Sequence, residues 1–149
     1  MKDRLGATAV AATVLFSDGA LAAEYGTAEE ARAMLDRVVV AMKADPVAAL
    51  AKFNAGNAEF RDRDLYPFCI GADGRTTAHA DAAQLGQPVH DLNDVEGKAF
   101  GEEILKVSEE GKINEVTYNW PKPGSQEPLP KVSFVTKIAD QTCGVGYYK

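Results

Sequence analysis

Short β-prone runs separated by turn residues fill the second half of the chain, and they constrain the fold more than any other feature. One helical pattern interrupts them between Pro88 and Gly111, with Phe100, Ile104 and Val107 on one face. Runs of this length, bounded by Gly, Asp and Pro, are typical of strands joined by hairpin turns. The sequence therefore predicts five strands, with a helical crossover after the second. The runs are residues 65–70, 76–80, 113–120, 132–138 and 142–148.

Two helices are predicted before these strands. Thr27 and Glu30 have the spacing of a capping box, and apolar residues follow at helical spacing. Asp45 followed by Pro46 predicts the start of a second helix, which we expect to end at Gly56. The residues expected to face the core are Met34, Leu35, Val38, Met42, Leu50 and Phe53.

Length and charge limit the number of domains and the kinds of partner. A chain of 149 residues with 46% hydrophobic and 26% charged residues is ordinary for one soluble globular domain. Its formal net charge is -6, and basic and acidic residues alternate along the chain. Nucleic-acid binding requires clustered Lys and Arg, so we predict no nucleic-acid partner.

The first 22 residues have the pattern of an export signal. Lys2 and Arg4 form a short basic start, residues 5–16 are mostly apolar, and Ala20 and Ala22 supply the small residues that a signal peptidase reads. An uncleaved anchor is the alternative, but the apolar stretch is shorter than the roughly 20 residues needed to span a bilayer. We therefore expect a cleaved signal peptide, a mature domain covering residues 23–149, and a periplasmic location.

Cysteine content agrees with export. Cys69 and Cys143 are the only two cysteines, and neither lies in a CxxC pattern. An even count in an exported chain favours one disulfide. The alternative is two unpaired thiols buried as small apolar groups.

No catalytic or metal-binding motif stands out. His79 and His90 are the only histidines, so a tetrahedral Cys/His zinc set cannot be completed. The sequence lacks GxSxG, Walker and GxGxxG motifs; the glycines of residues 144–146 fall inside the last strand without a following helix. We predict no catalytic residue, no metal and no cofactor. Three acids before the third helix do not match an EF-hand and are interpreted as a solvated helix entrance: Asp91, Asp94 and Glu96.

An aromatic face on the third strand is a candidate binding surface. Val116, Tyr118 and Trp120 alternate, so their side chains share one face, and Asn119 points away. Two amphipathic aromatics on one face can enclose a small pocket and offer a directional hydrogen bond. The same spacing is also typical of a plain core face, and the residues alone leave both interpretations open.

Taken in order, these segments resemble the single Cache domain of type 2, an extracytoplasmic sensor module with a PAS-like sheet that binds small organic ligands. The resemblance spans about residues 28–148. It is carried by LYPFCIGADGRTTAHAD, VTYNWPKPG and PKVSFVTKIADQTCGVGYY. It implies an α+β fold in which a five-stranded antiparallel sheet follows an N-terminal helical arm. It also implies that the first and last strands are neighbours, which would bring Cys69 and Cys143 together.

The resemblance also implies a set of ligand-binding residues. In the family, the Tyr-x-Trp strand and the strand after the Pro-containing hairpin line the ligand cavity. By this resemblance, Tyr118 and Trp120 form the wall of the cavity, and Lys131 is the cation opposite a ligand carboxylate. His79, in TAHAD, corresponds to the family's Ala-His-Pro and would donate to the carboxylate. Tyr66, from the first strand, is expected to reach the same cavity.

Taken alone, several of these residues have simpler interpretations. A lysine that opens a strand, as Lys131 is expected to do, is usually solvated, and a histidine at a strand end is usually a surface hydrogen-bonding group. Phe134 stands where the family often has a tyrosine, so no hydroxyl is available there. The weaker candidates, at a hairpin tip, beside a turn and in a loop, are Lys122, Arg75 and His90.

The first functional hypothesis is a free-standing periplasmic protein that binds a short organic acid, such as acetate, propionate, pyruvate or lactate, without transforming it. Since no membrane helix or output domain follows the sheet, we expect a signal to pass through a membrane receptor or sensor. The second is an accessory interaction module with a vestigial pocket that docks on a membrane receptor or enzyme. A small hydrolase or isomerase, with scattered candidates such as Ser133 and His79, ranks third. Val39 and Val40 leave a homodimer through the N-terminal helix open.

Overall fold

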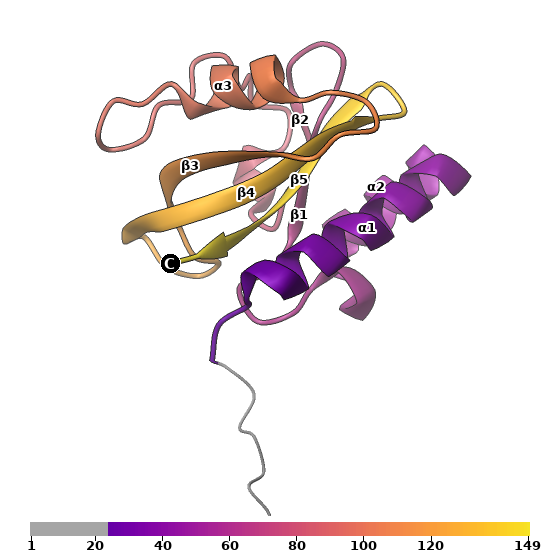
Figure 1. Ribbon diagram of the computed structural model, residues 1–149, viewed down its shortest axis with the longest axis horizontal. Coiled ribbons are helices and arrows are strands. Elements are labelled where there is room, and N and C mark those ends of the chain that lie inside the picture. Colours follow the sequence, from indigo (N-terminus) through magenta and orange to yellow (C-terminus); the bar gives the residue numbers. More distant parts are fainter. Residues whose placement is uncertain (1–23) are drawn as a thin grey trace, which may run out of the picture.

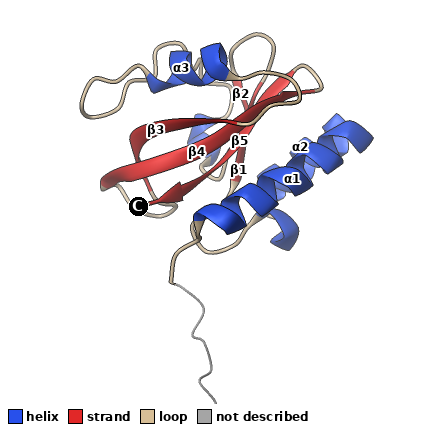
Figure 2. Ribbon diagram, in the orientation of Figure 1, coloured by secondary structure: helices blue, strands red, loops and turns tan. Residues whose placement is uncertain are grey.

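The computed structural model describes residues 24–149 and consists of one sheet with helices on both faces (Figure 1 and Figure 2). The predicted signal peptide, residues 1–22, lies outside the described residues. The α-helices are α1 (Ala28–Ala44), α2 (Pro46–Ala55) and α3 (Phe100–Val107). The strands are β1 (Pro67–Ile70), β2 (Thr76–Ala78), β3 (Asn114–Pro121), β4 (Pro128–Ile138) and β5 (Gln141–Tyr148). Two short 3-10 helices are η1 (Ala58–Phe60) and η2 (Ala82–Gln84).

The five strands pair in the order β2-β1-β5-β4-β3, and every pairing is antiparallel. Helices α1 and α2 cover one face of the sheet, and α3 lies over the other face beside β3 (Figure 1). This arrangement confirms the predicted α+β, PAS-like fold with an N-terminal helical arm. It also confirms that β1 and β5, the first and last strands, are neighbours.

The helical arm forms as its capping residues predict. The Thr27 hydroxyl accepts from the Glu30 backbone N–H at 3.2 Å, and the Glu30 carboxylate accepts from the Thr27 N–H at 2.9 Å. Asp45 caps α2, and Gly56 ends it in the left-handed conformation with φ 70. The predicted core residues of the arm are buried, apart from a partly buried leucine in α2. They are Met34, Leu35, Val38, Met42 and Phe53, with Leu50 packed against them.

A disulfide joins Cys69 of β1 to Cys143 of β5, as predicted. The two residues are direct partners across the strand pair, and both are fully buried in the core under α1. The alternative of two unpaired thiols is therefore wrong. Because the bridge joins positions 74 residues apart, it restricts the unfolded chain over most of the sheet-forming sequence.

The third helix is shorter than predicted. Within residues 88–111 only Phe100–Val107 is helical. The helix ends because Ser108, its C-cap, adopts an extended backbone conformation. Before it, Gly97 has φ +83, which closes a turn that a continuous helix could not contain. The apolar face was identified correctly, because Phe100 and Ile104 are buried.

Asp94 is responsible for the turn that precedes α3. Its carboxylate accepts from the backbone N–H groups of Glu96 and Lys98 at 3.0 Å each, and from the Asn119 backbone N–H at 3.0 Å. These N–H groups, that of Asn119 first, hold the pKa of Asp94 below its usual range. Asp94 lies partly exposed in the loop before α3, as the interpretation of a solvated helix entrance requires, and it also ties that loop to edge strand β3.

Strand β4 begins at Pro128, so Lys131 does not open its strand as predicted. The predicted strand began at residue 132 because Pro128 and Pro130 lack a backbone N–H and cannot donate to a sheet ladder. The pairing of β4 with β5 ends at the pair Lys131 and Tyr148, so Pro130 is not required to donate to β5. The Pro130 carbonyl accepts from the Lys149 N–H at 3.0 Å. Lys131 is consequently inside a central strand.

The first two strands are also shorter than their apolar runs. Leu65 belongs to a tight turn with Asp62, in which the Leu65 N–H donates to the Asp62 carbonyl at 2.8 Å. Residues 65–70 are nonetheless all buried, as their composition predicts. Strand β2 ends at Ala78, which leaves His79 immediately after it.

The outward face of α1 leaves Val40 69% exposed, whereas Val39 packs partly against the core. The homodimer through this helix stays a prediction. Among residues 24–149, no helix combines the length and the apolar character that crossing a membrane requires.

We predict that replacing both disulfide cysteines, Cys69→Ala with Cys143→Ala, lowers the free energy of unfolding by about 4 kcal/mol. The reason is the restored freedom of the unfolded chain over the 74-residue separation. Guanidinium titration of the variant and of wild type measures the difference. Wild type treated with a reductant should show the same loss, and an unchanged midpoint after confirmed reduction would contradict the prediction.

Candidate functional site

A small cavity lies between the sheet and α3. Its volume is about 40 Å³, and it adjoins an open cleft of about 700 Å³ bordered by the β3–β4 hairpin. All five residues predicted to bind a ligand line this one cavity: Tyr66, His79, Tyr118, Trp120 and Lys131. The rest of the lining is largely apolar and comes from β1, α3 and the loop before α3: Phe68, Ile70, Val89, Leu92, Phe100 and Ile104.

Lys131 is the one cation among the described residues that line the cavity, and it is 1% exposed. Its Nζ donates to the Tyr66 hydroxyl at 3.0 Å. It lies 4.3 Å from the ring centre of Tyr66, 5.4 Å from that of Tyr148 and 5.7 Å from that of Phe68. Within the described residues, no carboxylate comes close enough to Nζ for an ion pair. Lys131 is therefore a buried amine surrounded by aromatic rings.

Burial lowers the pKa of Lys131 to about 7, and the more distant Asp64 opposes that shift. Asp64 cannot serve as a close counter-ion, because its Oδ1 accepts from the Gly26 N–H at 2.7 Å and its Oδ2 lies 3.9 Å from Lys122. An ammonium at Lys131 thus has aromatic faces and one hydroxyl as neighbours. An anion entering the cavity would supply the missing charge.

Two glycines on β5 make room for this arrangement. A Cβ at Gly146 would lie 2.4 Å from Lys131 Cε and 2.4 Å from Ser133 Oγ, and one at Gly144 would lie 2.5 Å from the Phe68 ring. Such distances are too short for any side chain. Gly146 therefore lets Lys131 cross β5 toward Tyr66, which explains the GVG sequence that matches no nucleotide-binding motif.

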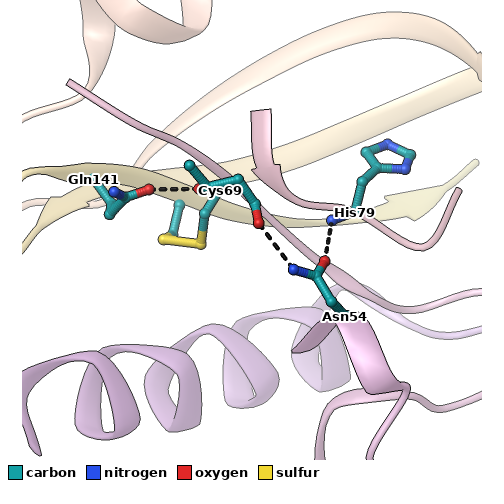
Figure 3. The surroundings of a disulfide bond; sticks show 6 residues. Asn54, Cys69, His79 and Gln141 are labelled. Carbon is teal, nitrogen blue, oxygen red and sulfur yellow. Dashed lines mark hydrogen bonds between the residues drawn. A yellow bond between two sulfur atoms is a disulfide. The ribbon is translucent and has the colours of Figure 1, made fainter. Parts of the chain in front are cut away.

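His79 is held in place from the opposite side of the sheet. Asn54 of α2 accepts from the His79 backbone N–H at 3.1 Å and donates to the Thr77 carbonyl at 2.9 Å (Figure 3). The Asp81 N–H donates to His79 Nδ1 at 2.9 Å. Burial, together with the charge of Lys131, lowers the pKa of His79 to about 4. A neutral imidazole whose Nδ1 accepts must carry its proton on Nε2, so His79 retains one N–H donor.

The two aromatic residues of β3 form the wall of the cavity. Tyr118 stacks on Phe100 with ring centres 4.2 Å apart, and Trp120 lies 5.5 Å from Phe100 and 6.0 Å from His79. The Tyr118 hydroxyl is shared with Ser133 at 2.9 Å, and burial raises the pKa of Tyr118. Tyr118 therefore shapes the cavity, and its hydroxyl is already bonded. Ser133 pairs with Tyr118 rather than with a histidine.

Of the three weaker candidates, Lys122 lies at the cleft, and Arg75 and His90 lie elsewhere on the surface. Lys122 borders the cleft, and its Nζ lies 3.0 Å from the ring centre of Tyr25, with only 17% of the side chain exposed. The expectation that this hairpin lysine faces water is therefore wrong. Arg75 and His90 are exposed, as expected. Phe134 lies under α1 on the other face of the sheet, so its missing hydroxyl does not affect the cavity.

Sequence reasoning missed three residues of the site. Gln84 of η2 lines both the cavity and the cleft, Asn54 positions His79, and Gly146 makes room for Lys131. A lone Gln or Asn carries no spacing signal. The alternating Gly144 and Gly146 were visible in the sequence, and two glycines on one face of a strand indicate a close approach by another group. Within residues 24–149, no cluster of three or more His, Cys, Asp or Glu could hold a metal ion.

An antiparallel PAS-like sheet with a helical arm on one face and an aromatic-lined cavity on the other defines a ligand-binding sensor domain. The family model described as Single Cache domain 2 matches residues 26–148, and the chain belongs to this family. Its members are extracytoplasmic sensor modules that bind small ligands.

Solved structures of chemotaxis sensors share the fold. A methyl-accepting chemotaxis protein from Vibrio parahaemolyticus is similar with a TM-score of 0.67 and 24% identity, over 80% of this chain and 86% of that one. A periplasmic sensor domain of a chemotaxis protein has a TM-score of 0.60 and 26% identity, over 80% and 88%. A Cache chemosensory domain studied for its carboxylic acid recognition has a TM-score of 0.58 and 22% identity, over 80% and 86%.

We predict that Gly146→Ala destabilises the fold by about 1–3 kcal/mol, because the new methyl group overlaps Lys131 and Ser133. Urea unfolding measures the loss. In a Ser133→Ala background the same substitution should cost less, since one of the two overlapping atoms is gone. An unchanged unfolding midpoint in the single variant would show that Lys131 does not occupy the space above Gly146.

Proposed function

We propose that this protein is a periplasmic binding and sensing protein for a short organic carboxylate, and that it does not transform its ligand. The observation that carries the proposal is the buried Lys131 amine, which has no carboxylate neighbour within ion-pair distance among residues 24–149. A carboxylate bound in the cavity would provide that neighbour and would itself be shielded from water.

The donors around the cavity suit a carboxylate. The Lys131 ammonium and the His79 Nε2–H line the same space, and charge-assisted hydrogen bonds to an anion are stronger than neutral ones. Trp120 adds an indole edge to the wall. Since His79 stays neutral above a pKa of about 4, it would act as a hydrogen-bond donor and not as a second charge.

The cavity volume supports a short ligand. About 40 Å³ exceeds the space of one water molecule and leaves room for only a few non-hydrogen atoms. A Cache chemosensory domain of similar fold is known for carboxylic acid recognition, which agrees with this choice of ligand class. We infer that a ligand signal passes to a membrane receptor or sensor, since similar domains belong to chemotaxis proteins.

Replacement of Lys131 by Met should abolish carboxylate binding. We expect the affinity for acetate, propionate, pyruvate or lactate, whichever binds wild type, to fall at least about 30-fold, because the ligand would lose its buried charged partner. Isothermal titration calorimetry on ligand-free protein measures the change. Lys137→Met is the matched control, since Lys137 is an exposed lysine of the same strand, and its affinity should remain at the wild-type value.

Equal affinities of wild type and Lys131→Met would reject the assignment of Lys131. Failure of wild type, shown to be ligand-free, to bind any short carboxylate would reject the proposed function. That second outcome would favour the alternative, an accessory module whose cavity is vestigial and whose surface docks on a membrane receptor or enzyme.

Carboxylate binding should take up a proton above pH 7. With a pKa of about 7, Lys131 of the empty protein is mostly neutral at pH 8, and the bound anion favours the charged form. Affinity should therefore be flat between pH 5.5 and 6.5 and should fall by up to about tenfold per pH unit above 7. Calorimetry in buffers of different ionisation enthalpy counts the protons. Binding at pH 8 without proton uptake would contradict the lowered pKa of Lys131.

A further inference from the structure

Gln84 occupies the boundary between the cavity and the cleft. Four residues line both spaces, and Gln84 is the one among them with a side-chain amide: Tyr66, His79, Gln84 and Trp120. It lies on η2, held by a hydrogen bond from its own backbone N–H to the Asp81 carbonyl at 3.0 Å. Its side chain is half-buried and makes no hydrogen bond to any residue within 24–149.

Most other polar groups near the cavity are already paired. The Tyr66 hydroxyl accepts from Lys131, the Tyr118 hydroxyl is shared with Ser133, and the Tyr148 hydroxyl donates to the Pro121 carbonyl at 2.7 Å. On the proposed function, Lys131 and His79 are committed to the carboxylate. Within residues 24–149, three polar groups of the lining then have no hydrogen bond to another side chain or to the backbone: the Gln84 amide, the Thr76 hydroxyl and the Trp120 indole N–H. Of these, only the Gln84 amide both donates and accepts through separate atoms.

The small volume places a ligand beside Gln84. Lys131 and Gln84 both line a cavity of about 40 Å³, so an acid anchored at Lys131 cannot fill it without approaching Gln84. An unsubstituted alkyl chain would face the amide without bonding it, and the amide would keep its contact with water on the cleft side. An oxygen on the carbon next to the carboxylate could exchange a hydrogen bond with the amide.

We propose that Gln84 selects 2-hydroxy or 2-oxo acids over unsubstituted acids of the same length. This inference rests on the proposed function and adds the chemical class of the ligand. The amide suits both classes, because its N–H₂ donates to an oxo group and its carbonyl accepts from a hydroxyl. The discrimination comes from a hydrogen bond to the half-buried amide that only the substituted ligand can make.

The experiment compares lactate with propionate, and glycolate with acetate, on ligand-free wild type, Gln84→Met and Thr76→Val. Calorimetry should show that wild type prefers the 2-hydroxy acid about tenfold or more within each pair. In Gln84→Met the 2-hydroxy acid should fall to the level of the plain acid, whose own affinity should stay within about twofold. Thr76→Val should keep the wild-type preference. Thermal unfolding checks that each variant is folded.

Other outcomes overturn the inference in distinguishable ways. If wild type binds both acids of a pair equally, or if Gln84→Met keeps the preference, the carboxylate site stands and the role of Gln84 is rejected. If Thr76→Val abolishes the preference while Gln84→Met does not, the oxygen is recognised by Thr76. If wild type binds none of the four acids, the proposed function fails and this inference fails with it.

Discussion

The burial of Lys131 is the constraint on which the rest of the site depends. An amine 1% exposed in the middle of a central strand is costly unless its surroundings accept both its length and its charge. Gly146 leaves space for the Lys131 side chain, and the Tyr66 hydroxyl accepts a hydrogen bond from Lys131 Nζ. The rings of Tyr148 and Phe68 pack around the amine in place of water. These aromatic faces attract a cation only weakly compared with a carboxylate. The cavity is therefore organised around an amine whose charged form has no carboxylate partner among residues 24–149.

The two faces of the sheet differ in composition, and the face covered by α1 and α2 fixes part of the geometry of the cavity on the other face. Under α1 the core is apolar and carries the disulfide, whereas the opposite face holds the aromatic-lined cavity with its buried amine. Asn54 connects them, because from α2 it bonds the backbone on both sides of Ala78 and so fixes the position at which His79 leaves β2 (Figure 3). The helical face thus fixes the backbone position of His79, and precise placement of donors is what a small ligand with little apolar area requires.

Local patterns predicted most of the fold, and tertiary contacts account for the errors. The capping box at Thr27, the buried stripe of α1 and the alternation of β3 depend on neighbours in sequence, so they were readable. The length of α3 was not, because Asp94 closes its turn with Asn119 from another strand. Lys131 was misplaced at a strand start because its burial depends on where β5 ends and on Gly146 across the ladder. Resemblance supplied the five cavity residues, and nothing local pointed to Gln84.

A lysine suits this position in a way that an arginine would not. Arginine keeps its charge at every accessible pH, so an empty cavity would always contain an unpaired cation. Lys131, with a pKa lowered by burial to about 7, can release its proton when the cavity is empty and regain it with an anion. Between pH 7 and the usual pKa of a lysine, Lys131 is protonated in the unfolded chain but not in the ligand-free folded protein. Because unfolding takes up a proton in this range, the contribution of Lys131 to the free energy of unfolding rises with pH there. The empty state thereby avoids most of the cost of a buried charge above pH 7, and occupancy becomes linked to protonation.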